Sequence, residues 1–213
     1  VAMTSVTTTQ LVFTVTSPSI NGVTCSLTWQ NVRVRPTAGT PLASGNLGVI
    51  GTASLVTVTT NSNLGSLREI AGVANQLGMQ TQPPAGATAG LAFAQQPVIQ
   101  VRDQFGNLRS SANGNSDNST VVTAARSAGS GVLQGTTSVT MSDGVATFSD
   151  LTHNVATNIT ILFNSGSLVS TTSTSIAVSP AAASTLVFTT QPDNATAGSA
   201  FWDQTAVTGQ DGF

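Results

Sequence analysis

The chain has 213 residues, of which 39% are hydrophobic and only 7% are charged, and its formal net charge is −2. Its basic residues are all arginines, so no lysine is present for a Schiff base or an isopeptide bond, and no basic surface is expected for nucleic acid. No apolar run approaches the roughly 20 residues of a membrane-spanning helix, so we expect no membrane insertion.

The N-terminal part, residues 1–76, is rich in Val and Thr, which favour strands, and poor in strong helix formers. We expect three strands here, at residues 10–16, 23–36 and 51–60. In the middle strand Cys25 and Trp29 share one face whereas Val32 lies on the other, which predicts a bulge near Gln30–Asn31. The single cysteine is expected to be buried and unpaired.

The stretch from Ser66 to Leu77 admits two interpretations. Ser66 and Glu69 have the spacing of a capping box, and the apolar residues that follow have a helical period, which would give a capped helix. The corresponding stretch before the next repeat contains Pro180, which disfavours a helix. We therefore expect a last strand and a linker here, with the helix as the alternative.

An internal repeat organises the rest of the chain. The segment Leu77-Gly-Met-Gln-Thr-Gln-Pro83 returns as Leu186-Val-Phe-Thr-Thr-Gln-Pro192, at an offset of 192 − 83 = 109 residues. Further along, Ala87-Thr-Ala-Gly90 returns as Ala195-Thr-Ala-Gly198, at an offset of 198 − 90 = 108, so one residue is deleted in between. The markers of the repeat are the pairs Pro83 and Pro192, Gly90 and Gly198, Asp103 and Asp211, and Phe105 and Phe213.

One complete copy of the repeat lies between these markers, at residues 77–183. Short strands separated by turn residues, in a unit of this length, are typical of an immunoglobulin-like β-sandwich. We expect its strands at residues 77–81, 87–93, 96–102, 119–126, 131–140, 144–149, 157–163 and 169–178.

Turn chemistry supports these strand positions. Asp103 begins a turn that ends at Asn107, where its carboxylate accepts local backbone N–H groups and the Gly-Asn pair supplies positive φ. A second turn at residues 142–144 precedes a strand in which alternate residues of 145–148 face opposite ways. Pro83 is expected to end a first strand that breaks and crosses to the other sheet, because it lacks a ladder donor.

At these residues the chain resembles a known family. Val98 to Asn107, VIQVRDQFGN, followed by Ser142 to Phe148, SDGVATF, is similar to the bacterial immunoglobulin-like repeats of the invasin and intimin type. The resemblance covers residues 77–213, and residues 1–76 only loosely. It implies a sandwich fold, display at the cell surface and a stalk or adhesive role, and it carries no catalytic residues.

The two ends of the chain differ from a complete copy. Residues 184–213 correspond to the first two strands of a further repeat, and residues 1–76 have about the length that such a repeat would lack. One interpretation is that residues 184–213 of one subunit complete residues 1–76 of a neighbour by strand complementation, which gives a head-to-tail polymer. The other is that the chain is a window on a longer polypeptide whose adjacent repeats complete one another.

Residues that carry enzymatic or metal chemistry are sparse. His153 is the only histidine and is expected in an exposed loop, with no nucleophile elbow to pair with it. The acidic residues are spread singly, mostly in turns, so calcium has only Asp103 and Asp150 as candidate ligands, at a domain junction. We expect no catalytic residue, no cofactor and no enzyme activity.

A few surface features suggest modification or binding. Asn118, Asn158 and Asn194 begin glycosylation sequons. Trp29 and Trp202 suit stacking on sugars, although packing in a core or a junction is their more ordinary role. Two arginines, Arg33 and Arg35, share a strand face that we expect to be solvated.

These features predict an all-β chain of tandem immunoglobulin-like β-sandwiches, with incomplete domains at both chain ends. We expect an extracellular or cell-surface structural or adhesive protein that forms a stalk or a head-to-tail filament, with itself or adjacent repeats as its partner. The alternative is a glycan- or receptor-binding module of a secreted enzyme or a phage particle.

Overall fold

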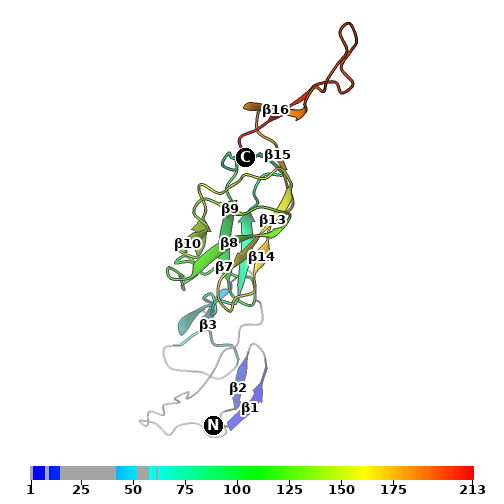
Figure 1. The fold of residues 1–213 in the computed structure, drawn as a ribbon. Helices are drawn as coiled ribbons and strands as arrows, with labels where there is room; N and C mark the ends of the chain where they lie inside the picture. Colours follow the sequence, from blue (N-terminus) through cyan, green and yellow to red (C-terminus); the bar gives the residue numbers. More distant parts are fainter. Residues whose placement is uncertain (1, 8–9, 15–41, 52–57, 61) are drawn as a thin grey trace, which may run out of the picture. The chain divides into compact units, whose positions relative to one another are not determined.

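The computed structural model describes residues 2–7, 10–14, 42–51, 58–60 and 62–213, and these residues form strands, turns and loops without a helix (Figure 1). The expectation of an all-β chain is therefore confirmed. By their contacts the residues divide into two compact units, Val1–Ala38 with Ala43–Glu69, and Gly39–Leu42 with Ile70–Phe213. Within the described ranges, no helix that could cross a membrane is found.

The first unit is described as two antiparallel strand pairs. β1 (Ala2–Val6) pairs with β2 (Leu11–Thr14), and β3 (Ser44–Leu47) pairs with β4 (Gly65–Arg68). β2 lies within the expected strand 10–16. The turn before it is closed by the Gln10 backbone N–H, which donates to Thr7 Oγ1 at 3.0 Å.

Other expectations for this unit have different outcomes. The capped helix considered between Ser66 and Leu77 is wrong, because Gly65–Arg68 is a strand and the next strand begins at Gln76. β3 was not expected, since Ser, Gly and Asn have low strand propensity. Several expectations lie outside the described residues, namely the strand 23–36 with its bulge, most of the strand 51–60, Cys25, Trp29, Arg33 and Arg35.

The second unit holds two packed sheets, here called the sandwich, followed by a two-stranded ribbon (Figure 1). One sheet has the order β11-β7-β5, and the other has the order β10-β8-β13-β15-β6 with β14 paired to β13. A short pair, β9 with β12, lies beside them. The sandwich strands are β5 (Gln76–Thr81), β6 (Gly86–Thr88), β7 (Val98–Arg102), β8 (Val121–Ala128), β9 (Leu133–Gln134), β10 (Ser138–Thr140), β11 (Val145–Thr147), β12 (Thr152–His153), β13 (Asn158–Asn164), β14 (Thr171–Thr172) and β15 (Ile176–Ser179), and the ribbon strands are β16 (Thr185–Thr190) and β17 (Ala206–Gln210).

The chain crosses from one sheet to the other just after its first sandwich strand. β5 pairs with β7, whereas β6 pairs in parallel with β15 in the opposite sheet. Pro83 lies between β5 and β6, as expected, because a proline has no N–H for the ladder. β6 ends at Thr88, earlier than the expected strand 87–93, because Gly90 turns the chain with a φ of 75°.

The remaining sandwich strands lie near their expected positions, with three differences. The expected strand 131–140 is divided into β9 and β10, because Gly135 takes a φ of 91° and the Thr136 N–H donates to Asp150 Oδ1 at 2.8 Å. The expected strand 169–178 is divided into β14 and β15. The short strand β12 was not expected at all.

A single apolar core lies between the two sheets. Phe148 and Phe163 are fully enclosed, with ring centroids 5.4 Å apart, and Ile99 and Ile176 belong to the same buried cluster. The expected alternation in residues 145–148 is confirmed, since Ala146 and Phe148 point into this core while their neighbours do not. Burial of each large side chain stabilises the fold by about 1.5–3 kcal/mol.

The sandwich begins earlier than residue 77. The second unit includes residues from Ile70 onward, and backbone bonds tie this lead-in to later loops. The Ala71 N–H donates to Asn113 O at 3.0 Å, and the Asn75 N–H donates to Arg102 O at 2.9 Å. Sequence identity between the copies is low in this stretch, so hydrogen bonding and not side-chain identity marks the start of the repeat.

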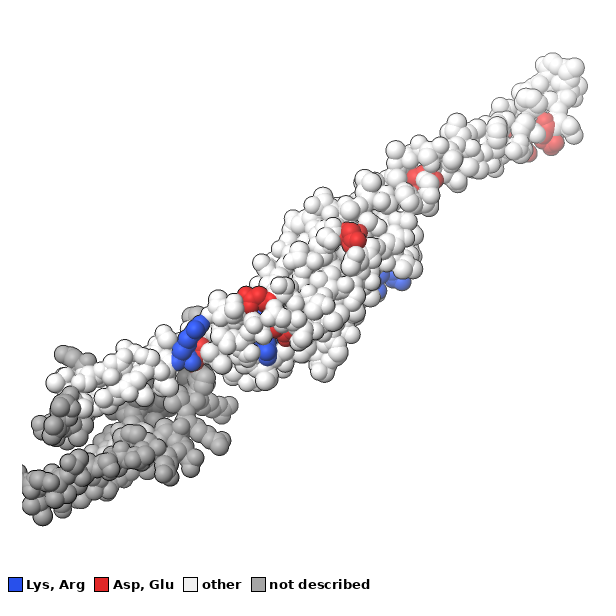
Figure 2. Space-filling model, turned by 90° about the vertical axis from the view of Figure 1, so that its left-hand side faces the viewer, with Lys and Arg blue, Asp and Glu red and all other residues white. Residues whose placement is uncertain are grey.

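Charged side chains are few and scattered on the face of the molecule in Figure 2. This pattern follows from the composition, in which 7% of residues are charged. Surface of this kind offers little electrostatic repulsion between copies of the chain.

Candidate functional site

The ribbon repeats the first strand pair of the sandwich in register. In the sandwich Gln76 lies opposite Arg102, and in the ribbon Thr185 lies opposite Gln210. These pairs are separated by 185 − 76 = 109 and 210 − 102 = 108 residues, the two offsets of the sequence match. Each residue pair between these ends is reproduced in the same order.

The irregularity in this pairing is also repeated. The register of β5 with β7 shifts between Met79 and Thr81, and the register of β16 with β17 shifts between Phe188 and Thr190. A bulge inserts one unpaired residue and increases the local twist, so its position is a specific feature of a strand pair. The second copy therefore shares the geometry of the first as well as its sequence.

A hydrogen bond from a glutamine side chain closes the same loop in both copies. Gln96 Nε2 donates to Phe93 O at 3.0 Å, and Gln204 Nε2 donates to Phe201 O at 3.0 Å. The preceding turn contains a glycine with positive φ in each copy, 75° at Gly90 and 84° at Gly198. An L-residue with a side chain rarely adopts this conformation, which explains why glycine stands at both positions.

The Asp103 carboxylate organises the turn after β7. Oδ1 accepts from the backbone N–H groups of Phe105 and Asn107, both at 2.9 Å, as the turn pattern predicted. Oδ2 accepts from the Gly72 N–H at 2.9 Å and from Asn107 Nδ2 at 3.0 Å. One buried carboxylate thus joins the lead-in of the sandwich to its first turn.

The ribbon contains the same arrangement. Asp211 Oδ1 accepts from the Phe213 N–H at 3.3 Å, and Asp211 Oδ2 accepts from the Ala181 N–H at 3.0 Å. Ala181 corresponds to Gly72, because 181 − 72 = 109. The lead-in residue is therefore part of the repeat, a feature that the sequence comparison missed because glycine and alanine occupy it.

Hydrogen bonds control the ionisation of two buried aspartates. Burial opposes the charged form of Asp103, but the bonds from Gly72, Asn107 and Phe105 outweigh it and lower the pKa of the carboxyl. Burial likewise opposes ionisation of Asp117, and the bonds from residues 119–120 with the charge of nearby Arg109 lower its pKa.

The two calcium candidates have their oxygens engaged by donors. Both oxygens of Asp103 accept hydrogen bonds, as described above. Asp150 Oδ1 accepts from the Thr136 N–H at 2.8 Å and Oδ2 accepts from Thr136 Oγ1 at 2.9 Å, and these bonds lower the pKa of Asp150. In the part of the chain that the structure describes, no three His, Cys, Asp or Glu side chains are grouped as metal ligands would be.

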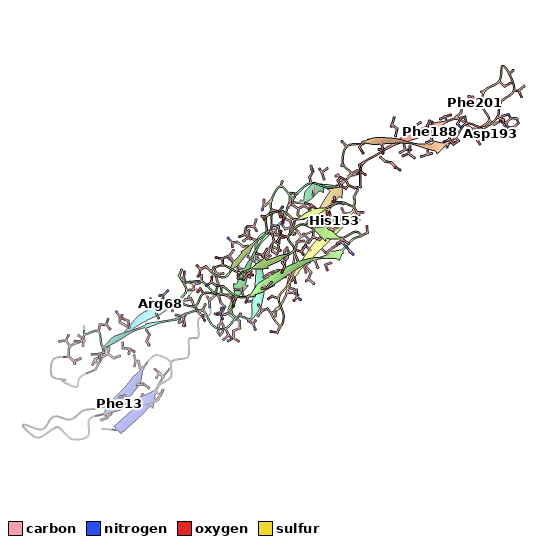
Figure 3. All side chains as sticks on the ribbon, turned by 60° about the vertical axis from the view of Figure 1, so that its left-hand side comes forward. Phe13, Arg68, His153, Phe188, Asp193 and Phe201 are labelled. Atoms are coloured by element: carbon pink, nitrogen blue, oxygen red, sulfur yellow. The ribbon has the colours of Figure 1, made fainter. Side chains whose placement is uncertain are left out.

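The expectation that His153 lies in an exposed loop is wrong. The residue belongs to β12 and is fully buried in the sandwich (Figure 3), and its Nε2 lies 2.9 Å from Ser130 O. Its backbone carbonyl accepts from the Gly90 N–H at 3.0 Å. The sequence from Asp150 to His153 predicts a loop, because the short β9–β12 pairing has no local sequence signal. The imidazole is a packing element and has no solvent access for acid–base chemistry.

The apolar residues of the ribbon are exposed, whereas the matching residues of β5 and β7 in the sandwich are buried. Leu186 is 79% exposed whereas Leu77 is 5% exposed, and Val207 is 48% exposed whereas Ile99 is fully buried. Figure 3 shows Phe188 projecting from the ribbon. The ribbon therefore presents to solvent the side chains that form a core in the complete copy.

The remaining candidate residues lie at the surface. Asn118, Asn158 and Asn194 are all exposed, so their side chains are accessible to modification. Trp202 is 85% exposed and does not act as a core or junction residue in this structure. Its counterpart in the sandwich is Ala94, at 202 − 94 = 108, which is also exposed.

A comparison of the chain with models of protein families gave no match, and a comparison with curated proteins gave none either.

Proposed function

We propose that the chain is part of an extracellular structural or adhesive repeat protein, in which tandem immunoglobulin-like sandwiches join end to end as a stalk or a filament. The observation that carries the proposal is the reproduction of register, bulge and turn hydrogen bonds in the second copy. A chain that repeats the first strand pair of a module, one module length further along, has the organisation of a repeat protein.

The strand order of the sandwich supports an immunoglobulin-like topology. The first strand is divided between the two sheets, and its second half, β6, pairs in parallel with the last strand, β15. The three-stranded sheet β11-β7-β5 faces the larger sheet around a core of alternating residues, as in immunoglobulin-type sandwiches. The resemblance to invasin- and intimin-type repeats points to the same topology.

The path of the chain supports an elongated assembly of sandwiches. The chain enters the sandwich at residues 70–75 and leaves it after β15 at the other end (Figure 1). Modules connected in this way extend along a line, with each contacting its neighbours. A stalk requires this arrangement, because a module whose two ends lay side by side would fold the array back on itself.

Labelling of intact cells that produce the protein tests the location. Antibodies against the sandwich are expected to bind cells with unbroken envelopes, and external protease is expected to remove the epitope. Labelling that appears only after the cells are lysed would contradict an extracellular role.

Force spectroscopy tests the load-bearing role separately. A pull along the chain loads β6 and β15 in shear because they are parallel neighbours, so their hydrogen bonds resist together. The sandwich runs from Ile70 to Ser179, which is 179 − 69 = 110 residues, and we expect one unfolding step that lengthens the chain by roughly 3.5 Å for each residue released. Extension without a force peak would contradict a stalk.

Trp202 favours glycan binding as a second candidate function. Because the corresponding position in the complete sandwich is also at the surface, Trp202 is expected to stay accessible when the ribbon is covered. An exposed indole ring stacks on the apolar face of a sugar. Titration with oligosaccharides, comparing the natural chain with Trp202→Ala, tests this function; binding that the substitution leaves unchanged would remove it.

A further inference from the structure

The ribbon has two unlike faces. In the antiparallel pairing Leu186 lies opposite Gly209 and Phe188 lies opposite Val207, so Leu186, Phe188 and Val207 share one face, here called the ribbon face. All three are exposed. The intervening residues on the other face are mainly Thr and Gln, which water solvates well.

The complete sandwich shows what a ribbon face packs against. Leu77 and Ile99, the counterparts of Leu186 and Val207, are buried in one cluster with Phe163 and Ile176. Those two residues come from β13 and β15, the later strands of the same repeat. A ribbon face is therefore complementary to a surface made by the later strands of a repeat.

The first unit contains an exposed strand pair with matching properties. Gly45 lies opposite Leu67 and Leu47 lies opposite Gly65, so two leucines and two glycines share one face of β3 and β4, here called the acceptor face. Both leucines are exposed. A side chain placed at Gly45 would meet nothing within 4 Å, and one at Gly65 would meet only Leu47, so the glycines leave space for a large apolar side chain.

The order of the strands along the chain also indicates that the first unit ends with the last strand of a repeat. β4 precedes Gly72, whose N–H binds Asp103, and β15 precedes Ala181, whose N–H binds Asp211. β4 thus occupies the place along the chain that the last strand of a repeat occupies. The last strands of a repeat are those that cover a ribbon face in the sandwich.

We infer that the ribbon face of one chain docks on the acceptor face of the first unit of a second copy. Neither face contains a charged residue, so apolar burial drives the contact, and Phe188 is the side chain large enough to fill the space beside the glycines. The two faces are different surfaces, so the contact is heterologous, and it extends into a filament unless its rotation closes a ring. The inference rests on the proposed function, because it names the contact that joins subunits.

Two single variants of the full chain test the contact. Leu186→Asp places a charge on the ribbon face, and Leu67→Asp places one on the acceptor face. By sedimentation velocity the natural chain is expected to form concentration-dependent polymers, whereas each variant stays monomeric at concentrations at least about tenfold higher. The matched controls are Val187→Asp and Asn46→Asp, on the opposite faces of the same strand pairs, and these are expected to polymerise.

Mixing the two variants shows which surface of a second copy the ribbon face binds. Each variant retains one intact face, so an equimolar mixture is expected to form dimers and nothing larger. Self-association of Leu67→Asp alone would show that ribbons pair with each other and would overturn the inference. A monomeric natural chain, or a mixture that stays monomeric, would also overturn it. These outcomes leave the surface labelling and the force peak unchanged, so failure of this contact is distinguishable from failure of the proposed function.

Discussion

Gln82 Oε1 accepts a hydrogen bond from the Thr174 backbone N–H at 3.1 Å, across 92 residues of sequence. Gln82 lies at the crossing between the sheets, and Thr174 lies between β14 and β15. The carbonyl oxygen of Gln82 also accepts from Gln95 Nε2 at 2.9 Å. One glutamine thus ties the first strands of the sandwich to the last ones, and the repeat has a glutamine at the same place, Gln191.

Gln82→Ala is expected to lower the free energy of unfolding of the sandwich by about 1 kcal/mol, the usual net value of a hydrogen bond at a partly solvated site. Urea denaturation measures the change. Gln191→Ala is the matched control, because among the described residues the Gln191 side chain makes no hydrogen bond like that of Gln82 with Thr174. Equal effects of the two substitutions would contradict a specific tie between the first and last strands.

Asp103→Ala is expected to destabilise the sandwich by about 3 kcal/mol, because the backbone N–H groups of Gly72, Phe105 and Asn107 lose a charged acceptor, and that of Asn107 is buried. The pKa of Asp103 is lowered in the folded state, so its contribution is fully present above the unfolded pKa. That contribution is lost as the pH falls through the lower, folded pKa. Acid unfolding of Asp103→Ala should therefore be less steep than that of the natural chain, whereas Asp203→Ala, in the exposed loop of the ribbon, should match the natural chain.

His153→Ala is expected to lower the free energy of unfolding by about 3 kcal/mol, since it leaves a cavity and removes the contact with Ser130 O. His153→Leu restores apolar volume without that contact, and it should recover part of the loss. Thermal denaturation of the two variants separates packing from hydrogen bonding. Natural stability in both variants would show that the buried imidazole has no structural role.

Gly144→Ala and Gly166→Ala separate crowding from backbone strain. Both glycines have positive φ, 79° and 50°, so alanine is strained at each by about 1–2 kcal/mol. A Cβ at Gly144 would also clash with the backbone carbonyl oxygen of Arg109, whereas one at Gly166 would meet nothing within 4 Å. In a denaturant titration, Gly144→Ala is therefore expected to lower the free energy of unfolding clearly more than Gly166→Ala does. Equal losses in the two variants would contradict the close packing of the turn at Gly144.

The sequence predicts the strands and turns of the sandwich well, because their signals are local. Alternation predicts that Ala146 and Phe148 share one face, which the structure shows to be the core face, and the Asp103 turn follows from residues within a single loop. The repeat itself was visible because Gln, Pro and Gly stand at positions where side-chain identity matters. These residues have specific backbone or hydrogen-bonding roles, and so they persist in both copies.

Other features were not predictable, because their causes lie far away in sequence. The burial of His153 depends on β9, and the start of the sandwich at Ile70 depends on backbone bonds to later loops. Backbone N–H donors such as those of Gly72 and Ala181 carry no side-chain signal. The match between Gln82 and Gln191 indicates that a glutamine is needed at this position. It does not predict that the hydrogen-bond partner of Gln82 is Thr174.

We infer that the ribbon builds the first strand pair of a second sandwich, and cross-strand nuclear Overhauser contacts in the natural chain measure this pairing. The expected contacts pair Phe188 with Val207 and Thr190 with Ala206, with Thr189 outside the backbone ladder between them. A ribbon in continuous register without the bulge, or one without cross-strand contacts, would disprove the second copy of the strand pair.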